Sequence, residues 1–353
     1  MFEHAIGLAD LGYNITLVVP SMADLRRQNW HRIFFERHPL ICWEEITTAG
    51  RTLFDIAIAT FWRTLLELGK LRANKYIYFV QSIESRFYPE TDEVVRAIVE
   101  ATYELDIGYI TEARWIKSYL EGVRGREVEL ARNGVRKSLF NADGAKISER
   151  PSGKLRVLIE GPIDADFKNV PDTIAICREI AGCELWLLTS SDLDSYDRVD
   201  RVFSKLPIDE VGSVYRSCDV LVKLSFVEGM FGPPLEMFHC GGTAIVYDVT
   251  GFDEYMTHGR NSLVAKTGDR TEVSEFLSLL VESNNLLEHL KRGAAATATN
   301  WPSWEQAVIA FEGAVQAAAM AGSCTQDNLQ VVGRRLQHIM HANWRELRRA
   351  REG

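Results

Sequence analysis

Short apolar runs alternate with amphipathic helical patterns along most of this sequence, and that alternation is the strongest constraint on its fold. The runs have the length of strands, and the segments between them repeat with the period of an α-helix. Such an order is typical of α/β domains that contain a parallel sheet. In the first half of the chain the predicted strands are 15–19, 54–59, 76–80, 107–110 and 128–131.

The same alternation restarts after a polar segment, 141–153, which we interpret as a linker. Beyond it the sequence predicts strands at 155–159, 184–189, 218–224 and 243–248, and helices at 172–181 and 208–217. A chain of 353 residues is long for one hydrophobic core and comfortable for two. We therefore predict a first domain over 1–145, a second over 153–303, and C-terminal helices over 304–353, the first of which crosses back toward the first domain.

Two glutamates eight positions apart, Glu228 and Glu236, flank a Gly-Pro-Pro turn after the predicted strand 218–224. Proline suits the first turn of the helix predicted to follow, over 235–240. In parallel sheets ligands gather beyond the carboxyl ends of strands, and the N–H groups of a helix N-terminus attract phosphate. We expect Glu236 in the first helical turn, where a carboxylate can accept hydrogen bonds from a ribose diol. The loop therefore predicts a nucleotide-sugar site.

This loop resembles the signature of the family 4 retaining glycosyltransferases, which have the GT-B fold. The Glu-(seven residues)-Glu pattern stands between a strand end and the Gly241-Gly242 pair. Further segments that resemble the family are Asn133-Gly134-Val135 with Phe140, the acidic turn 251–254 with 259–264, and the start of a closing helix at 301–305. The resemblance spans residues 2–320, and the segment 78–89 is most similar to bacterial rhamnosyltransferases that build surface glycans.

The resemblance implies an α/β chain in which two Rossmann-like domains face a cleft. The predicted helix 3–11 begins almost at the first methionine, where a GT-B domain has a strand. We therefore expect the N-terminal domain to lack its first strand, which would deprive neighbouring strands of hydrogen-bond partners. Two interpretations follow: the sequence is a truncated or mis-started version of a longer protein, or the sheet tolerates the gap.

The resemblance also implies how the donor is held. Glu236 would hold the ribose hydroxyls and Glu228 the donor sugar. The backbone N–H groups that would line the diphosphate and sugar belong to Gly229, Met230, Phe231 and Gly232. Leu206, before the helix 208–217, lies where the family packs the nucleotide base.

A lysine and an arginine neutralise the leaving diphosphate in this family. Lys168 matches the lysine, and we assign catalysis to Lys168 and Glu228. Pro162 stands near the position of the arginine, so one of two cations that would stabilise the departing charge is missing. Arg156 and Lys223 are the candidate substitutes.

The loop after the predicted strand 76–80 is the candidate acceptor or sugar side of the site. Gln81 stands where many family members have a histidine that faces the donor sugar. Glu84, Arg86 and Tyr88 would recognise sugar hydroxyls. The alternative is a loop that packs at the domain junction, which its aromatic residues would also suit.

The activity implied by the resemblance is that of a hexosyltransferase that acts with retention. It would move a sugar, with rhamnose as one candidate, from a dTDP-, UDP- or GDP-sugar to a glycan or lipid-linked acceptor in bacterial surface polysaccharide synthesis. We expect no metal and no cofactor, because no Asp-x-Asp pair adjoins a strand and a helix N-terminus with a lysine would stabilise the diphosphate. The alternative is a non-catalytic or truncated GT-B module that binds nucleotide or glycan, or partners another transferase.

Composition limits the classes of binding partner and the cellular compartment that we expect for this protein. A net charge of −9 argues against a general nucleic-acid binder. No apolar run approaches the roughly 18 residues that cross a bilayer, and the N-terminus resembles no signal peptide, so we expect a cytoplasmic protein. The Arg-rich segment 329–351 predicts a basic amphipathic helix. It either contacts the inner membrane surface or packs on its own domain.

Overall fold

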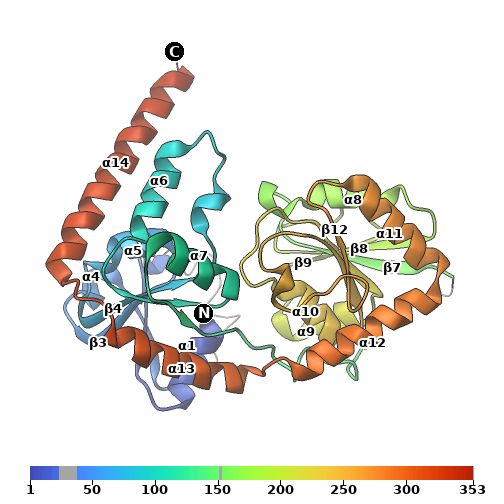
Figure 1. Ribbon diagram of the computed structural model, residues 1–353, viewed down its shortest axis with the longest axis horizontal. Helices are drawn as coiled ribbons and strands as arrows, with labels where there is room; N and C mark the ends of the chain where they lie inside the picture. Colours follow the sequence, from blue (N-terminus) through green and yellow to red (C-terminus); the bar gives the residue numbers. More distant parts are fainter. Residues whose placement is uncertain (24–37, 151–152, 353) are drawn as a thin grey trace. The chain divides into compact units, whose positions relative to one another are not determined.

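The computed structural model describes residues 1–23, 38–150 and 153–352. The chain divides into two compact units (Figure 1). Unit 1 consists of Met1–Asn133 and Trp304–Gly353, and unit 2 of Gly134–Ser303. Pro151 and Ser152 of the expected linker, and Gly353 at the end of the expected C-terminal helices, lie outside the described residues. None of the helices in the described ranges has the length and apolarity that a membrane span requires.

Unit 2 is built on a six-stranded parallel sheet with the spatial order β12-β11-β10-β7-β8-β9. Its strands are β7 (Leu155–Glu160), β8 (Cys183–Thr189), β9 (Arg201–Ser204), β10 (Val220–Lys223), β11 (Thr243–Tyr247) and β12 (Leu263–Ala265). The chain starts at the centre with β7, moves outward to β9, and returns to the other side of β7 with β10. The direction of winding therefore reverses between β7 and β10, which is where ligands bind in doubly wound sheets.

Helices cover both faces of this sheet, with α8 and α11 on one side and α9, α10 and α12 on the other (Figure 1). Their bounds are α8 (Val170–Arg178), α9 (Ile208–Arg216), α10 (Gly232–His239), α11 (Arg270–Glu282) and α12 (Asn284–Asn300). The described residues of unit 2 also form the short 3₁₀ turns η2 (Asp166–Lys168) and η3 (Phe252–Glu254). The central strands are buried on both faces, which explains why they are continuously apolar rather than alternating.

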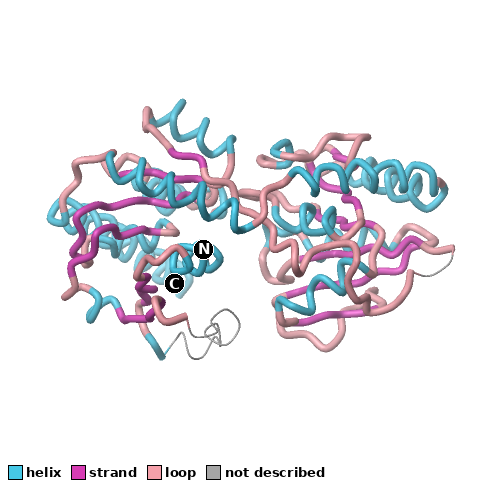
Figure 2. Tube along the Cα trace, turned by 90° about the horizontal axis from the view of Figure 1, so that it is seen from below, coloured by secondary structure: helices cyan, strands magenta, loops and turns pink. Residues whose placement is uncertain are grey.

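Unit 1 contains a four-stranded parallel sheet in the order β3-β4-β5-β6 and a separate parallel pair, β1-β2. Figure 2 shows the described strands of the chain in magenta and the helices in cyan. The strands are β1 (Ile15–Val19), β2 (Ile41–Glu45), β3 (Leu53–Ala59), β4 (Arg72–Val80), β5 (Gly108–Thr111) and β6 (Glu129–Leu130). Before residue 133, the described part of the chain includes the helices α1 (Phe2–Asp10), α4 (Ile46–Ala49), α5 (Trp62–Leu68), α6 (Glu93–Thr102) and α7 (Arg114–Arg124), with the 3₁₀ turn η1 (Glu84–Phe87). As the sequence predicted, a helix precedes the first described strand.

The last two helices return to unit 1. Helix α13 (Trp304–Met320) packs on β4, β5 and β6, and α14 (Gln326–Glu352) packs on α5 and α6. Helix α14 buries Leu329, Leu336 and Met340. A Cβ atom on Gly333 would collide with the carbonyl oxygen of Leu66, so α14 and α5 meet at a distance that only glycine permits. The predicted amphipathic helix 329–351 is thus confirmed, and its apolar face belongs to the core of unit 1.

Candidate active site

The candidate site lies at the carboxyl ends of β7 and β10, the point where the winding of the unit 2 sheet reverses. Strand β7 ends at Glu160 and β10 ends at Lys223. Because Val222 pairs with Ile159 in the parallel register, the two charged residues emerge side by side. Residues far apart in the sequence therefore meet at one sheet edge.

Lys168 and Glu228 form a close ion pair at this edge. The Lys168 ammonium donates to both Glu228 oxygens, at 2.8 Å to Oε1 and 2.9 Å to Oε2. Turn η2 after β7 supplies Lys168, and the loop between β10 and α10 supplies Glu228. The Glu228 residue is only 6% exposed, so water does little to weaken the pair. The structure brings together the two residues that the sequence assigned to catalysis.

A second buried lysine adjoins this pair. Lys223 is 2% exposed, and its ammonium lies 2.7 Å from Glu160 Oε2, 3.1 Å from the Glu160 carbonyl oxygen and 3.8 Å from Glu228 Oε1. Burial by itself lowers the pKa of Lys223, but the charges of Glu160 and Glu228 more than offset burial and raise it. Lys223 is therefore a permanent cation at neutral pH. The sequence offered Lys223 only as a substitute cation and did not single out Glu160.

Glu236 lies in α10, but not in its first turn as expected. Helix α10 begins at Gly232, three residues earlier than predicted, because Pro233 and Pro234 both fit an α-helical first turn. Glu236 therefore falls in the second turn. Burial, followed by the charge of Glu160, raises the pKa of Glu236 to about 7, although a hydrogen bond from Tyr215 and the charge of Lys223 act in the opposite direction.

The N-terminus of α10 follows the loop that carries Glu228. Its N-cap is Phe231, whose carbonyl oxygen accepts a hydrogen bond from the Tyr255 hydroxyl. Since Pro233 and Pro234 have no N–H, backbone donors at this helix end come from residues up to Gly232. The expected diphosphate-lining segment, residues 229–232, thus immediately precedes or begins the helix.

The hypothesis that Arg156 substitutes for the missing arginine is wrong, because Arg156 lies at the amino end of β7. Its guanidinium donates to the carbonyl oxygens of Ser148 and Ser217, at 3.2 and 3.0 Å, and lies over the Trp186 ring. Pro162 instead follows the carboxyl end of β7 and lines a cavity of about 620 Å³ with residues of the loop after β8. The position expected to carry an arginine is therefore apolar and open.

Leu206 comes directly after β9, again at the carboxyl edge of the sheet, and packs partly buried against the core of unit 2. Pro207 is the N-cap of α9. The strand β9 was not predicted from the sequence. Its presence places Leu206 at the same sheet edge as Glu160 and Lys223.

The expected acceptor residues lie in unit 1, after the carboxyl end of β4. Gln81 donates to the Thr60 carbonyl oxygen at 2.8 Å, and the Tyr88 hydroxyl accepts from the Trp62 indole at 3.1 Å. The Arg86 guanidinium lies over the Trp115 and Tyr119 rings. These contacts order the loop after β4.

Glu84 points into the core of unit 1 and is 2% exposed. Its carboxylate accepts hydrogen bonds from the Trp62 N–H and the Tyr78 hydroxyl, both at 2.7 Å. Trp62 is the first residue of α5, so the carboxylate satisfies a donor at a helix N-terminus. Burial raises the pKa of Glu84 to about 7, despite these two hydrogen bonds.

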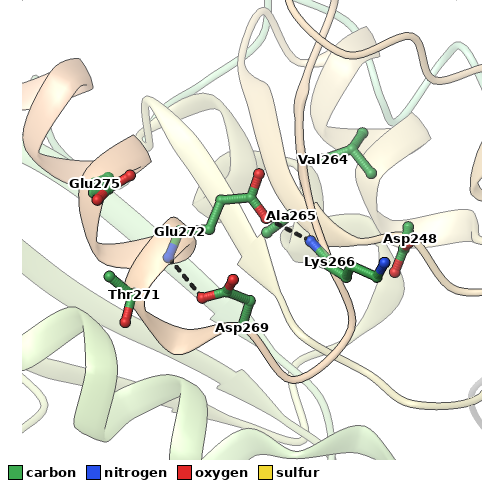
Figure 3. A pocket seen from close by; sticks show the side chains of 8 residues that line it. All are labelled: Asp248, Val264, Ala265, Lys266, Asp269, Thr271, Glu272 and Glu275. Atoms are coloured by element: carbon green, nitrogen blue, oxygen red, sulfur yellow. Dashed lines mark hydrogen bonds between the residues drawn. The ribbon is translucent and has the colours of Figure 1, made fainter.

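A separate acidic pocket of about 440 Å³ lies after β11 and β12 (Figure 3). Its polar side chains largely satisfy one another or nearby backbone: Glu272 accepts from the Lys266 N–H at 2.7 Å, and Asp269 accepts from the Glu272 N–H at 3.0 Å. An anionic diphosphate would be repelled here. Across the described residues no group of three or more His, Cys, Asp or Glu side chains is arranged to hold a metal ion.

Residues 194–297 match the family model "Glycosyl transferases group 1". The chain is 27% identical, over 72% of its length, to the O-antigen biosynthesis protein RfbC of Myxococcus xanthus. It is 32% identical, over 26% of its length, to an N,N'-diacetylbacillosaminyl-diphospho-undecaprenol α-1,3-N-acetylgalactosaminyltransferase of Campylobacter jejuni. The aligned regions make up 20% and 24% of those two proteins, so the chain spans only about a fifth to a quarter of their length.

Solved structures agree in fold at low sequence identity. Sucrose-phosphate synthase from Thermosynechococcus elongatus is 15% identical, with a TM-score of 0.73 over 89% of this chain and 91% of that one. HepE from Anabaena, in complex with UDP and glucose, is 14% identical, with a TM-score of 0.67 over 90% of this chain and 94% of that one. The chain therefore has the GT-B fold, and the predicted fold class is confirmed.

Proposed function

We propose that this chain, which carries a group 1 glycosyl transferase domain within a GT-B fold, is a retaining hexosyltransferase that uses a nucleoside-diphosphate sugar. One observation carries the proposal: Lys168 and Glu228 are paired at the switch point of the unit 2 sheet, beside the N-terminus of α10. A cation, a sugar-binding carboxylate and a helix N-terminus are what a sugar diphosphate requires.

In the proposed reaction, the bond between the sugar C1 and the diphosphate oxygen breaks as the acceptor hydroxyl bonds to C1 on the same face. The hydroxyl proton passes to the leaving phosphate. Lys168 and the α10 N-terminus stabilise the charge that develops on the diphosphate. Glu228 orients the sugar hydroxyls, and ionised Glu236 accepts hydrogen bonds from the ribose diol.

The donor is a nucleotide sugar, and we take UDP-sugars as the first candidates because HepE was solved with UDP and with UDP-glucose. Donors based on dTDP and GDP remain in the proposal, and rhamnose remains a candidate sugar through the resemblance of segment 78–89. Leu206 is the candidate contact to the base, since it lies at the carboxyl edge of the sheet.

The acceptor we propose is a glycan or a lipid-linked glycan of bacterial surface polysaccharide synthesis. Both curated relatives support this class, since one is named for O-antigen biosynthesis and the other for an undecaprenol-linked substrate. We assign acceptor recognition to unit 1, with Gln81, Arg86 and Tyr88 as contacts. Glu84 would act indirectly, because its buried carboxylate accepts a hydrogen bond from the first residue of α5 and so fixes the start of that helix.

Calorimetric titration of UDP, dTDP and GDP tests the donor site. One nucleotide should bind the wild type, and Glu236→Ala should weaken its binding ten- to a hundredfold, because a charge-assisted hydrogen bond contributes about 1.5–3 kcal/mol. Glu275→Ala is the matched control, since Glu275 is an exposed acid of the same unit in the other pocket. A folded protein that binds none of the three nucleotides would refute the proposal.

A non-catalytic GT-B module is the second candidate, and the apolar Pro162 in place of a cation favours it. Such a module would bind the nucleotide sugar without cleaving it. Release of nucleoside diphosphate from UDP-glucose, dTDP-rhamnose or GDP-mannose, with water as the slow acceptor, separates the two candidates. Release that Lys168→Met abolishes supports the enzyme, whereas tight binding without release supports the module.

We also propose that unit 1 contacts the inner, cytoplasmic membrane surface through α14. The exposed side of this helix carries Arg334, Arg335, Arg345, Arg348 and Arg349, opposite the face that packs on α5. Each such residue contributes about 1 kcal/mol near anionic lipid. Changing the last three to Gln should abolish co-sedimentation with vesicles that contain phosphatidylglycerol, while Arg201→Gln, Arg260→Gln and Arg292→Gln in unit 2 should not. Equal binding to neutral vesicles would contradict the idea.

A further inference from the structure

Lys223 is a buried charge to which the reaction described above gives no task. Lysine is rarely buried without a reason, because removing its ammonium group from water is costly. Here the ammonium stands between two carboxylates, at 2.7 Å from Glu160 and 3.8 Å from Glu228. Its neighbour in the site, Lys168, already makes both short contacts to Glu228.

We propose that Lys223 is a positioning residue that holds Glu228 in place when Lys168 turns from Glu228 to the diphosphate of the donor. The inference rests on the proposed function, and it assigns a task to the one cation of the cluster that the donor does not reach. At 2% exposure, Lys223 is enclosed by protein and acts through Glu228 rather than on the substrate.

The charges of the cluster show why such a residue is needed. Glu160, Glu228 and Glu236 stand against Lys168 and Lys223, and both ammonium groups are already paired. A diphosphate can therefore gain a lysine only by taking it from a carboxylate. Lys168 is the one to move, because its side chain is 22% exposed and extends from a short 3₁₀ turn.

If Lys223 were absent, that exchange would leave the Glu228 carboxylate without a nearby cation. Glu228 is 6% exposed, and a buried carboxylate without a cation is unfavourable, so the side chain would turn away from its position. Glu228 would then lose the charge-assisted hydrogen bonds that orient the donor sugar. Lys223 Nζ needs to approach Glu228 Oε1 by only about 1 Å to reach hydrogen-bond distance.

Glu160 holds the Lys223 ammonium close to Glu228. Both its carboxylate and its carbonyl oxygen accept from the Lys223 ammonium, and the paired ends of β7 and β10 fix the two residues relative to each other. The ammonium can therefore shift toward Glu228 while its contacts to Glu160 retain it. A rigid strand end is a better support for such a charge than a loop.

Titration of two ligands into variants tests the inference: the nucleoside diphosphate, and the sugar nucleotide of the donor panel that the wild type binds. Measured at about pH 9, where Glu236 stays ionised even without the Lys223 charge that lowers its pKa, Lys223→Met should leave affinity for the nucleoside diphosphate within about threefold of wild type, because Lys168 and ionised Glu236 remain. Affinity for the sugar nucleotide should fall at least about tenfold, because Glu228 no longer holds the sugar. Lys223→Gln, which retains a donor to the Glu160 carbonyl, replaces it if the first variant does not fold.

Lys291→Met is the matched control. Lys291, on α12, is also a buried lysine of unit 2 and pairs with Asp219 at 2.9 Å. This pair, however, stands at the amino end of β10, opposite the end that carries Lys223. Its loss should lower the melting temperature without changing the ratio of the two affinities. An unchanged ratio in the Lys223 variants, or an equal fall in both affinities, would overturn the inference. If wild type binds neither ligand, the proposed function fails as well, which is a distinct result.

Discussion

At the scale of single residues, the carboxyl group of Glu236 changes charge near neutral pH. Burial and the neighbouring Glu160 raise its pKa to about 7, whereas the exposed carboxyls of the acidic pocket have no comparable burial. A carboxylate accepts two hydrogen bonds from a diol, but a protonated carboxyl must donate one of its own. The protonation state of Glu236 therefore controls how well it holds a ribose.

The affinity for the sugar nucleotide should consequently rise with pH. The pKa of Glu236 is raised, so below about pH 7 the group is mostly protonated, and its binding contribution appears as pH increases through 7. We expect affinity at pH 6 to be about one tenth of that at pH 8, measured by calorimetry. A sugar nucleotide is the right probe because its phosphates stay ionised over this range.

Glu236→Gln serves as the control for that pH dependence. Glutamine keeps one acceptor and nearly the same volume but cannot ionise. Its binding should be weaker than that of wild type at pH 8 and nearly independent of pH. A pH dependence in Glu236→Gln as steep as that of wild type would show that another group is responsible.

Sequence reasoning reached some of these residues and missed others for physical reasons. Lys168 and Glu228 were found because a family resemblance placed Lys168 at the diphosphate and Glu228 at the donor sugar, although they are 60 positions apart. Glu160 gave no signal, because a glutamate at the end of an apolar run is usually a solvated strand end. Its role depends on which strand lies beside β7, and neighbouring strands are not determined by local sequence.

At the scale of elements, the long apolar strands were predictable, and so was the short edge strand β6, but three other short strands of the described chain were not. Strands β7, β8, β10 and β11 are confirmed within a residue or two. The unpredicted β9 and β12 lie at the two edges of the sheet, and β2 lies in the separate pair. These strands are short or mix charged with apolar residues, so their pairing partners rather than their own pattern make them strands.

The amino end of β10 is tied to α12 by a buried ion pair, and this contact predicts a measurable stability. Asp219, 6% exposed, accepts from Lys291 on α12 at 2.9 Å and from the Arg156 N–H at 3.0 Å. Asp219→Asn keeps the second contact but removes the buried anion of Lys291, which, among the described residues, retains only the exposed Glu288 at 3.2 Å. We expect a loss of about 3 kcal/mol in the free energy of unfolding, measured with denaturant.

Nucleotide affinity should not change in Asp219→Asn, because Asp219 lies at the opposite end of the sheet from Glu228. The matched control is Glu288→Gln, which removes the exposed partner of the same lysine and should cost less than about 1 kcal/mol. If the two variants are equally stable, the buried pair is not what secures α12.

At the scale of the whole molecule, each unit has a hydrophobic core of its own. The core of unit 2 runs from Val135 to Trp301, and unit 1 has two clusters built on its four-stranded sheet. The residues proposed to hold the nucleotide, Lys168 and Glu236, both belong to unit 2. Ligand binding should therefore stabilise unit 2 and leave the stability of unit 1 unchanged.

We expect a saturating nucleotide to protect unit 2 alone in hydrogen exchange. At a hundredfold excess over the dissociation constant, a ligand stabilises its binding unit by about 2.7 kcal/mol. Amide protection should increase across the strands of residues 155–265 and stay unchanged in β3, β4 and β5. Glu236→Ala in the same nucleotide concentration is the control, and equal protection of both units would show that they unfold together.

The order of the units along the chain has a consequence for the protein's synthesis. Unit 2 is continuous in sequence, whereas unit 1 is closed by α13 and α14, which come after unit 2. On a translating ribosome, unit 2 can complete its core while the apolar side of β4 and β5 is not yet covered by α13. Strands β4 and β5 thus emerge before unit 2 but are covered after it, and during that interval they are exposed to aggregation and in need of a chaperone.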